Sequence, residues 1–146
     1  MKLFEWMKHN TLIWAMLLLS VAGFADAAYL AIKKLVGSPI VCSALGGGCQ
    51  TVDASSFSSL FDVPLAMVGA IFYAVLIMLL TYYLQRRHMK VLYGALYLAL
   101  GGGLFSAYLI WLQAFTIRAW CFYCIISDTL AIVIALLALA VLKKSK

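Results

Sequence analysis

Charged residues are scarce in this chain. Asp, Glu, Lys and Arg make up 11% of its 146 residues, 66% are hydrophobic, and only two are proline. A soluble domain is about one quarter charged and about half apolar, so this composition excludes an ordinary soluble fold. The sequence also lacks internal repeats and low-complexity tails, and it leaves no room for a second domain. We therefore predict an integral membrane protein that forms a single domain over residues 1–146.

Four apolar runs are long enough to cross a bilayer. They cover about 11–32, 64–84, 91–113 and 120–142. About 20 helical residues, at about 1.5 Å each, span a hydrocarbon core of about 30 Å. The first run is too long for a signal-peptide core and lacks a convincing cleavage site, so we interpret it as a retained span. The predicted fold class is an all-α bundle of four transmembrane helices.

The only sizeable segment outside the predicted spans is an outer loop over residues 33–63. Gly37-Ser38-Pro39 is expected to break any continuation of the first helix. Within the loop, apolar residues at helical spacing predict a short half-helix over 54–61 that lies on the outer membrane surface. These residues are Phe57, Leu60 and Phe61. Asp62 is predicted to cap the second span, and a tight outer turn is predicted over 114–119.

The net charge of +6 does not indicate a nucleic-acid partner, because eight of the eleven basic residues fall on one side if the spans alternate. These eight are Lys2, Lys8, Arg86, Arg87, Lys90, Lys143, Lys144 and Lys146. The positive-inside rule then places both termini in the cytoplasm, so the loops that carry the cysteines face outward, where disulfides persist. This predicts a multi-pass protein of the plasma (inner) membrane. The dilysine spacing at the C-terminus keeps the endoplasmic reticulum membrane as an alternative.

The four cysteines form two pairs. Cys42 and Cys49 flank six residues that include three glycines, and Cys121 and Cys124 form a Cys-x-x-Cys motif at the start of the fourth span. Glycine lets a backbone swing, so we interpret the first pair as a shuttle that reaches the second. Two other interpretations stay open. The cysteines could form disulfides that only staple the protein. They could also form an all-thiolate zinc site, although the six residues between Cys42 and Cys49 fit the usual ligand spacing poorly.

The Cys-x-x-Cys motif has the features of a reactive pair. A helix N-terminus and a nearby cation favour the thiolate form of a cysteine. Cys121 is expected to have both, because the fourth span begins there and Arg118 lies three residues upstream. Cys124 is expected one turn deeper, toward lipid. Such a pair can accept electrons at Cys121 and deliver them inward from Cys124.

Two carboxyl groups lie within apolar spans, Asp26 in the first and Asp128 in the fourth. An intramembrane carboxylate is costly and is by default a functional hypothesis, here a proton relay or a hydrogen bond to an electron acceptor. The alternative is that each is protonated or caps backbone near the interface. In the third span, Gly101-Gly102-Gly103 favours close helix packing, with a flat ring against bare backbone as the alternative.

Several residue sets occur in a characteristic order. They are Gly23…Asp26-Ala27-Ala28-Tyr29-Leu30…Lys33, then Cys42…Cys49…Ser55, then Val63-Pro64-Leu65…Gly69…Tyr73, and finally Trp120-Cys121-Phe122-Tyr123-Cys124. This order resembles the vitamin K epoxide reductase family and its bacterial homologues, through most of the chain. The resemblance implies a four-helix bundle that encloses a quinone near its outer end.

The resemblance also implies residue roles. By position, Cys124 is similar to the cysteine beside the quinone, Cys121 to its resolving partner, and Cys49 to the loop cysteine that exchanges with Cys121. Cys42 is similar to the cysteine that meets the substrate protein. The remaining candidates are Ser55, which matches a serine of the family's active site, and Tyr73 and Tyr123 as quinone contacts.

Two departures from the family pattern narrow the predicted function. Bacterial relatives often carry a fused thioredoxin-like domain, whereas this chain is expected to stop after the fourth span, so its partner is expected to be a separate thioredoxin-fold (DsbA-like) protein. In the vertebrate enzymes that reduce vitamin K epoxide, a tyrosine stands four residues beyond the Cys-x-x-Cys motif, where this chain has Asp128. This difference favours disulfide formation over epoxide reduction.

We therefore predict a protein-disulfide:quinone oxidoreductase that passes electrons to ubiquinone or menaquinone in the membrane, without a metal. One alternative is a quinone or vitamin K epoxide reductase of the endoplasmic reticulum. The other is a non-enzymatic membrane protein, stapled by disulfides, that binds or assembles a partner.

Overall fold

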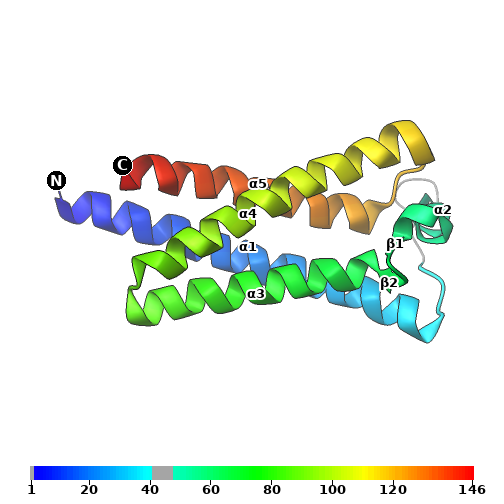
Figure 1. Cartoon of the computed structure of the whole chain (residues 1–146), viewed down its shortest axis with the longest axis horizontal. Helices are drawn as coiled ribbons and strands as arrows, with labels where there is room; N and C mark the ends of the chain where they lie inside the picture. Colours follow the sequence, from blue (N-terminus) through cyan, green and yellow to red (C-terminus); the bar gives the residue numbers. More distant parts are fainter. Residues whose placement is uncertain (1, 41–47) are drawn as a thin grey trace.

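The computed structural model describes residues 2–40 and 48–146, which form a bundle of four long helices with a small cap at one end (Figure 1). The long helices are α1 (Lys2–Val36), α3 (Leu65–Arg86), α4 (Met89–Trp111) and α5 (Phe122–Ser145). A π-helical segment, η2 (Leu112–Ile117), extends α4. Each long helix contains an apolar stretch that can cross a membrane. The predicted all-α fold with four spans is confirmed.

The four helices bury a shared apolar core along the bundle. α1 packs against α3 and α5, and α4 packs against α5 and α3. Fully buried core side chains come from every long helix: Ile13, Met16, Leu76, Leu80, Leu92, Leu96, Ile134 and Val141. In lipid, helices associate through close packing, which small residues permit. Gly103 on α4 serves this purpose, because a Cβ there would overlap Ala135 on α5.

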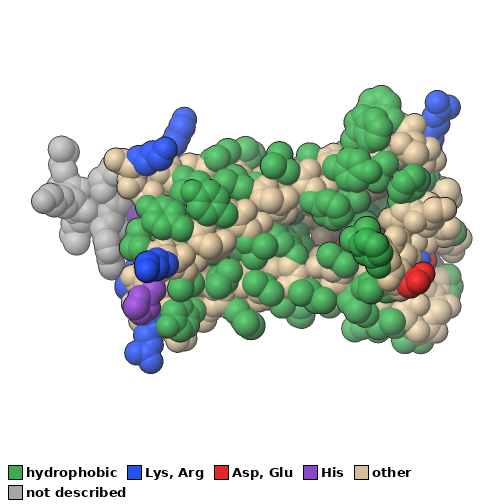
Figure 2. Space-filling view, viewed as in Figure 1, with side chains coloured by type: hydrophobic (Ala, Val, Ile, Leu, Met, Phe, Trp, Pro, Cys, Tyr) green, Lys and Arg blue, Asp and Glu red, His purple; other side chains and the backbone are tan. Residues whose placement is uncertain are grey.

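Both termini and the α3–α4 turn lie at one end of the bundle (Figure 1). Lys and Arg side chains gather at this end, and hydrophobic side chains cover the middle of the face shown in Figure 2. Arg87 forms the turn in a left-handed conformation and donates a hydrogen bond of 2.8 Å to Asn10 Oδ1. α1 begins at Lys2 rather than near residue 11, because the polar lead-in continues the helix beyond the apolar run.

The other end of α1 also extends past the predicted span. Lys33 and Lys34 were expected in the outer loop, but the helix continues to Val36. It ends at Gly37, which is left-handed and donates its N–H to the Lys34 carbonyl at 3.3 Å. The Ser38 N–H also caps the helix end, at 3.0 Å from the Lys33 carbonyl. These two hydrogen bonds end α1 and place Lys34 on its last turn. Lys34 therefore lies at the same level as the small cap at this end of the bundle.

The cap contains a short half-helix, but at a different place from the predicted one. It consists of α2 (Gly48–Ala54), a 3₁₀ turn η1 (Ser56–Ser58), and the strands β1 (Ser59–Leu60) and β2 (Val63–Pro64). The predicted helix over 54–61 is wrong. Phe61 and Asp62 are left-handed, and they reverse the chain so that β1 pairs with β2 in antiparallel fashion. Asp62 therefore does not cap α3, whose N-cap residue is Pro64.

The connection between α4 and α5 is shorter than the predicted turn over 114–119. η2 continues the helical path to Ile117, and Arg118 then turns the chain in a left-handed conformation. α5 begins directly afterwards, with Cys121 as its N-cap. π-helical segments are often found at functional sites, and this one buries Gln113 next to the start of α5.

Candidate functional site

Cys121 and Cys124 form a disulfide at the N-terminus of α5, with Cα atoms 5.2 Å apart. Cys121 also caps the helix, because its Sγ accepts a hydrogen bond from the Cys124 N–H at 3.3 Å. The first N–H groups of a helix lack partners within it, so this sulfur satisfies one of them. Only 1% of Cys121 is exposed, and any reaction at its sulfur must therefore be approached from within the protein.

Cys49, the second residue of α2, is fully buried in the cap. It packs in one apolar cluster with Leu30, Ile40 and Cys121, so the structure brings a cysteine of each predicted pair together. Cys49 is disulfide-bonded. The predicted site residue Cys42 lies outside the described residues.

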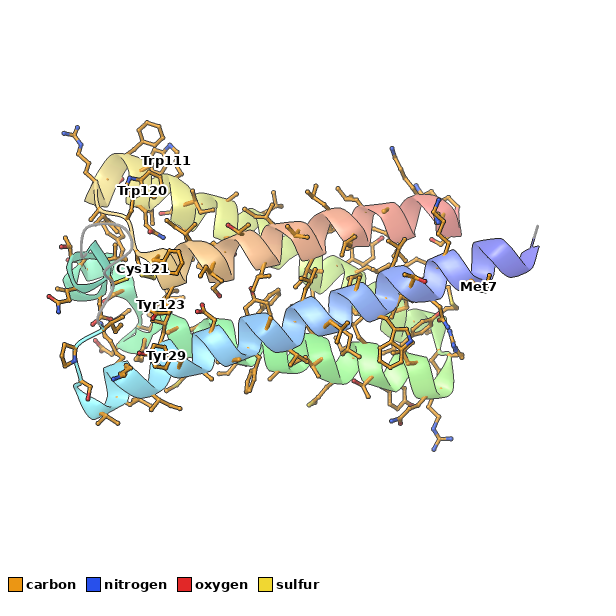
Figure 3. All side chains as sticks on the ribbon, turned by 180° about the vertical axis from the view of Figure 1, so that it is seen from behind. Met7, Tyr29, Trp111, Trp120, Cys121 and Tyr123 are labelled. Carbon is orange, nitrogen blue, oxygen red and sulfur yellow. A yellow bond between two sulfur atoms is a disulfide. The ribbon has the colours of Figure 1, made fainter. Side chains whose placement is uncertain are left out.

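The close approach of α2 to the start of α5 depends on Gly48. A Cβ at this position would overlap backbone atoms of Trp120, the residue that precedes Cys121. Figure 3 shows Trp120, Cys121 and Tyr123 at the end of the bundle that is opposite Met7. The backbone of the half-helix therefore rests directly on the chain that leads into the redox motif.

A cavity of about 310 Å³ lies beneath the cap, and Cys49, Cys121 and Cys124 all border it. Its apolar walls include Leu30, Val68, Phe72, Phe105, Leu109 and Leu112. The face shown in Figure 2 is hollowed between the diverging ends of α3 and α4 near the cap. Ligand sites are typically mostly apolar, with volumes of about 300–1,000 Å³ and a few placed polar groups. This cavity fits that description.

Part of the cavity wall is bare backbone from the glycine triplet of α4. Gly101 and Gly102 both border the cavity. A Cβ on Gly102 would overlap the Phe72 ring, whereas no atom lies within 4 Å of the place where a Cβ of Gly101 would be. The triplet thus combines close packing at Gly102 with bare backbone at Gly101, which is exposed and borders the cavity.

Few polar side chains border the cavity. Asp128 and Ser106, which are 7% exposed each, border it from α5 and α4. Tyr73 is 1% exposed, and its hydroxyl donates to the Ser127 carbonyl at 2.5 Å. Asp26 lies close enough to interact electrostatically with both Asp128 and Tyr73, although it is not one of the lining residues. One of its oxygens, Oδ2, is enclosed without a hydrogen-bond partner.

Besides Asp26, three other predicted site residues do not border the cavity: the supporting residues Ser55 and Arg118, and Tyr123, which was predicted to contact the quinone. Ser55 donates a hydrogen bond of 2.6 Å to the Val52 carbonyl and closes the end of α2. Arg118 is exposed in the turn before α5 and forms no ion pair in the part of the chain that the structure describes. The Tyr123 ring contacts that of Tyr29, with centroids 5.5 Å apart.

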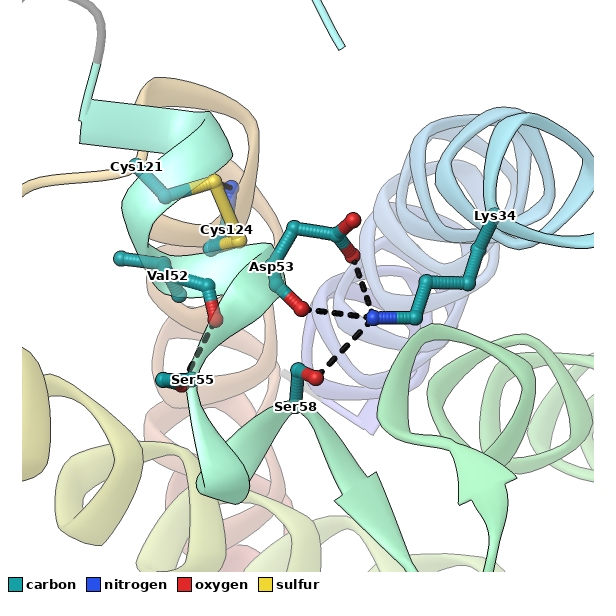
Figure 4. A network of polar contacts seen from close by, with 7 residues as sticks. All are labelled: Lys34, Val52, Asp53, Ser55, Ser58, Cys121 and Cys124. Carbon is teal, nitrogen blue, oxygen red and sulfur yellow. Dashed lines mark hydrogen bonds and ion pairs between the residues drawn. A yellow bond between two sulfur atoms is a disulfide. The ribbon is translucent and has the colours of Figure 1, made fainter. Parts of the chain in front are cut away.

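Lys34 holds the cap to the end of α1, a role that the sequence did not reveal. Its ammonium lies 2.9 Å from Asp53 Oδ1, and it donates to the Asp53 carbonyl at 2.6 Å and to Ser58 Oγ at 3.0 Å (Figure 4). The Asp53 carbonyl is one of the last in α2, where carbonyls lack partners within the helix and a cation is favourable. One side chain thus fixes the C-terminal end of α2 and the η1 turn.

Gln113 is the second site residue that sequence reasoning missed. It borders the cavity, is 4% exposed, and its Oε1 accepts the Cys121 N–H at 3.1 Å. The sequence did contain a signal for this residue. Gln113 is an uncharged polar residue at the end of an apolar span, and polar groups within a membrane are candidates for function. That it faces inward depends on the π-helical turn, which residue spacing does not show.

The sequence profile of the vitamin K epoxide reductase family matches residues 14–140. This range contains all four cysteines and the cap, together with most of every long helix. The chain belongs to the vitamin K epoxide reductase family. The match confirms the resemblance that the motifs indicated. No curated protein sequence matches the chain.

Vitamin K epoxide reductase family members are membrane oxidoreductases that couple quinone chemistry to thiols and disulfides, and membership assigns this chain to that class. Its own residues suit a quinone, since an apolar cavity with a bare-backbone wall adjoins a redox-capable disulfide. Within residues 2–40 and 48–146, no three His, Cys, Asp or Glu side chains gather as a metal site would require.

Proposed function

We propose that this protein is a protein-disulfide:quinone oxidoreductase that reoxidises a separate thioredoxin-fold protein. The observation that carries the proposal is the shared cavity, bordered by Cys49, Cys121 and Cys124. A protein whose disulfides only staple the fold needs no apolar space of this size beside a buried disulfide. A relay needs it, because sulfur exchange and quinone reduction must both reach the same pair of sulfur atoms.

Electrons would pass along the cysteines in steps that conserve atoms and charge. The partner's dithiol reduces the Cys42–Cys49 disulfide and becomes a disulfide itself. Cys49 thiolate then attacks Cys121, which forms a Cys49–Cys121 bond and releases Cys124 thiolate. Cys42 thiolate closes on Cys49 and frees Cys121. The resulting dithiol of Cys121 and Cys124 gives two electrons and two protons to a quinone and closes again as a disulfide.

The cavity residues would hold the quinone and supply its surroundings. The ring is accommodated by the bare backbone at Gly101 and by apolar walls such as Phe105. Asp128, which borders the cavity, is the carboxyl that can hold a proton there, and Asp26 is close enough to interact with it electrostatically. Tyr73 contributes its ring as a wall, because its hydroxyl is already bonded to the Ser127 carbonyl.

The proposed location is a plasma membrane, with the cap facing outward and the basic end in the cytoplasm. Support comes from the charge distribution, because the termini and the basic α3–α4 turn share one end and the cysteine motif lies at the other (Figures 1 and 3). This orientation puts the cap on the side where partners that form disulfides work. Either ubiquinone or menaquinone would serve as the acceptor.

Serine substitution of each redox cysteine tests the relay. We expect Cys121→Ser and Cys124→Ser to abolish reduction of a soluble quinone by a reduced thioredoxin-fold protein, because neither variant can re-form the disulfide. Quinone absorbance reports turnover. Normal turnover by either variant would refute the proposed route, and turnover of vitamin K epoxide by the wild type would favour the alternative activity.

Cys42→Ser is the matched comparison. It removes the cysteine assigned to the partner, so we expect turnover with the protein substrate to stop and turnover with a small dithiol such as DTT to continue. A small dithiol can reduce the second pair without the shuttle. Equal loss with both donors would contradict the assignment of Cys42.

A further inference from the structure

The Gln113 side chain is fixed at one end only. The Cys121 backbone N–H donates to it at 3.1 Å, and a donor must meet an oxygen, so the bonded atom is Oε1 and the other end is the amide nitrogen, Nε2. Gln113 lies in the π-helical segment η2, and its residue surface is 4% exposed. The orientation of the amide is therefore set by the backbone of the redox motif itself.

The Nε2 end has no acceptor among the described residues. Within that part of the chain, the one fully enclosed side-chain oxygen or nitrogen without a partner is Asp26 Oδ2. The Gln113 nitrogen is therefore not sealed off by protein atoms, and the open space that Gln113 borders is the cavity beside the disulfide. A buried amide donor that lacks a partner is costly, which favours a ligand that accepts its hydrogen bond.

We propose that the Gln113 amide donates a hydrogen bond to a carbonyl oxygen of the bound quinone and so holds that oxygen on the side of the Cys121–Cys124 disulfide. The inference rests on the proposed function and assigns a residue to the recognition of its acceptor. Two other donors near the cavity are engaged, since the Tyr73 hydroxyl is bonded to the Ser127 carbonyl and the Cys121 N–H to Gln113 itself.

The amide stabilises charge without supplying a proton. Quinone oxygens gain negative charge as electrons arrive, and a preoriented donor in an apolar site stabilises that charge more than water does. The two electrons and two protons still come from the Cys121 and Cys124 thiols, which close as a disulfide. Gln113 keeps its own protons throughout.

The test separates the quinone half-reaction from the thiol half-reaction. In Gln113→Met, which keeps the approximate length of the side chain without the amide, we expect the Kd and KM for a soluble quinone to rise about tenfold. Reduction of the Cys121–Cys124 disulfide by DTT, measured without quinone, should slow by a smaller factor, about threefold, because the buried Cys121 N–H loses its acceptor. Gln50→Met is the matched control, because Gln50 is exposed on α2, and all three quantities should stay near wild type.

A spectroscopic measurement on the wild type keeps the test independent of variant folding. With carbonyl-¹³C quinone bound to oxidised protein, the infrared band of one carbonyl should move to lower frequency than in detergent alone, and Gln113→Met should reverse this shift.

Three results would overturn the inference. They are unchanged quinone affinity in a folded Gln113→Met variant, equal slowing of both half-reactions, and carbonyl bands that coincide with those of free quinone. A wild-type protein that binds quinone but never reduces it with any dithiol would instead refute the proposed function, and the binding and infrared data would still decide the role of Gln113.

Discussion

Among single residues, Gly48 sets how closely the half-helix approaches the redox motif. Its Cα rests where any side chain would overlap the Trp120 backbone, and its neighbour Cys49 packs beside Cys121. Backbone atoms cannot move aside as the end of a flexible side chain can. Alanine at this position must therefore displace α2 or the start of α5.

We expect Gly48→Ala to impair exchange between the two cysteine pairs. In a Cys124→Ser background, where Cys121 has no resolving partner, oxidation should trap a Cys49–Cys121 disulfide that peptide mass spectrometry detects. Because small misplacements of reacting groups slow reactions strongly, Gly48→Ala should lower the trapped fraction by about tenfold.

Gly94→Ala is the control for this prediction, because no atom lies within 4 Å of a Cβ placed there. Its trapped fraction should equal that of the parent. A Gly48→Ala protein that forms the cross-linked species as readily as the control would show that the backbone contact does not position Cys49.

Residue types alone could not reveal such contacts. The cysteines and Asp128 were predictable, because their chemistry is unusual in an apolar chain. Gln113 matters because it accepts the Cys121 N–H, and Gly48 because it lies against the Trp120 backbone. Both contacts exist only once the π-helical turn and the half-helix have formed. No local pattern in the sequence encodes either contact.

At the scale of structural elements, α2 is fixed at both ends by different means. Its first residue rests on the chain that precedes α5, and its last turn is bound by the Lys34 ammonium. The pair of Lys34 and Asp53 is partly exposed, so its charge attraction is screened. The additional bonds to the Asp53 carbonyl and to Ser58 make the contact geometrically specific.

Lys34→Met should loosen this end of the cap. We expect the reduced Cys49 thiol, buried in the structure, to react with iodoacetamide about tenfold faster, because local opening becomes easier when the hydrogen bonds are lost. Asp53→Asn should have a smaller effect in the same direction. The double variant should resemble Lys34→Met alone, since both changes remove one contact.

Lys33→Met is the neighbouring control. The Lys33 ammonium lies 5.8 Å from the centroid of the Tyr29 ring and forms no hydrogen bond or ion pair with α2 among the described residues. Equal alkylation rates in Lys33→Met and Lys34→Met would mean that the ammonium network does not hold the cap.

The long helices were predictable, because length and hydropathy determine them. The elements of the cap were not, because their positions depend on the conformations of turn residues. Four apolar runs had to become four helices, because a backbone in hydrocarbon must satisfy its own hydrogen bonds. The half-helix was misplaced because the periodic Phe57, Leu60 and Phe61 enter a 3₁₀ turn and a strand pair, which the left-handed Phe61 and Asp62 impose. Such conformations are uncommon for residues other than glycine, and the sequence gives no warning of them.

At the scale of the whole molecule, the bundle separates a basic end from a sulfur-bearing end. This polarity gives a direct test of orientation in intact cells. In a variant whose four cysteines are replaced by serine, we expect an impermeant maleimide to label Ser56→Cys at once and Lys146→Cys only after permeabilisation. Both residues are exposed, so accessibility within the protein does not limit labelling. The reverse pattern would place the cap in the cytoplasm.

The chamber beneath the cap has a kinetic consequence. Cys121 is almost wholly enclosed, and one small space borders both the sulfur from α2 and the site suited to the electron acceptor. Under the proposed relay, the thiol donor and the oxidant would therefore act in alternation on a protein with two stable oxidation levels. We expect double-displacement kinetics, in which reciprocal plots at several fixed donor concentrations run parallel rather than converge.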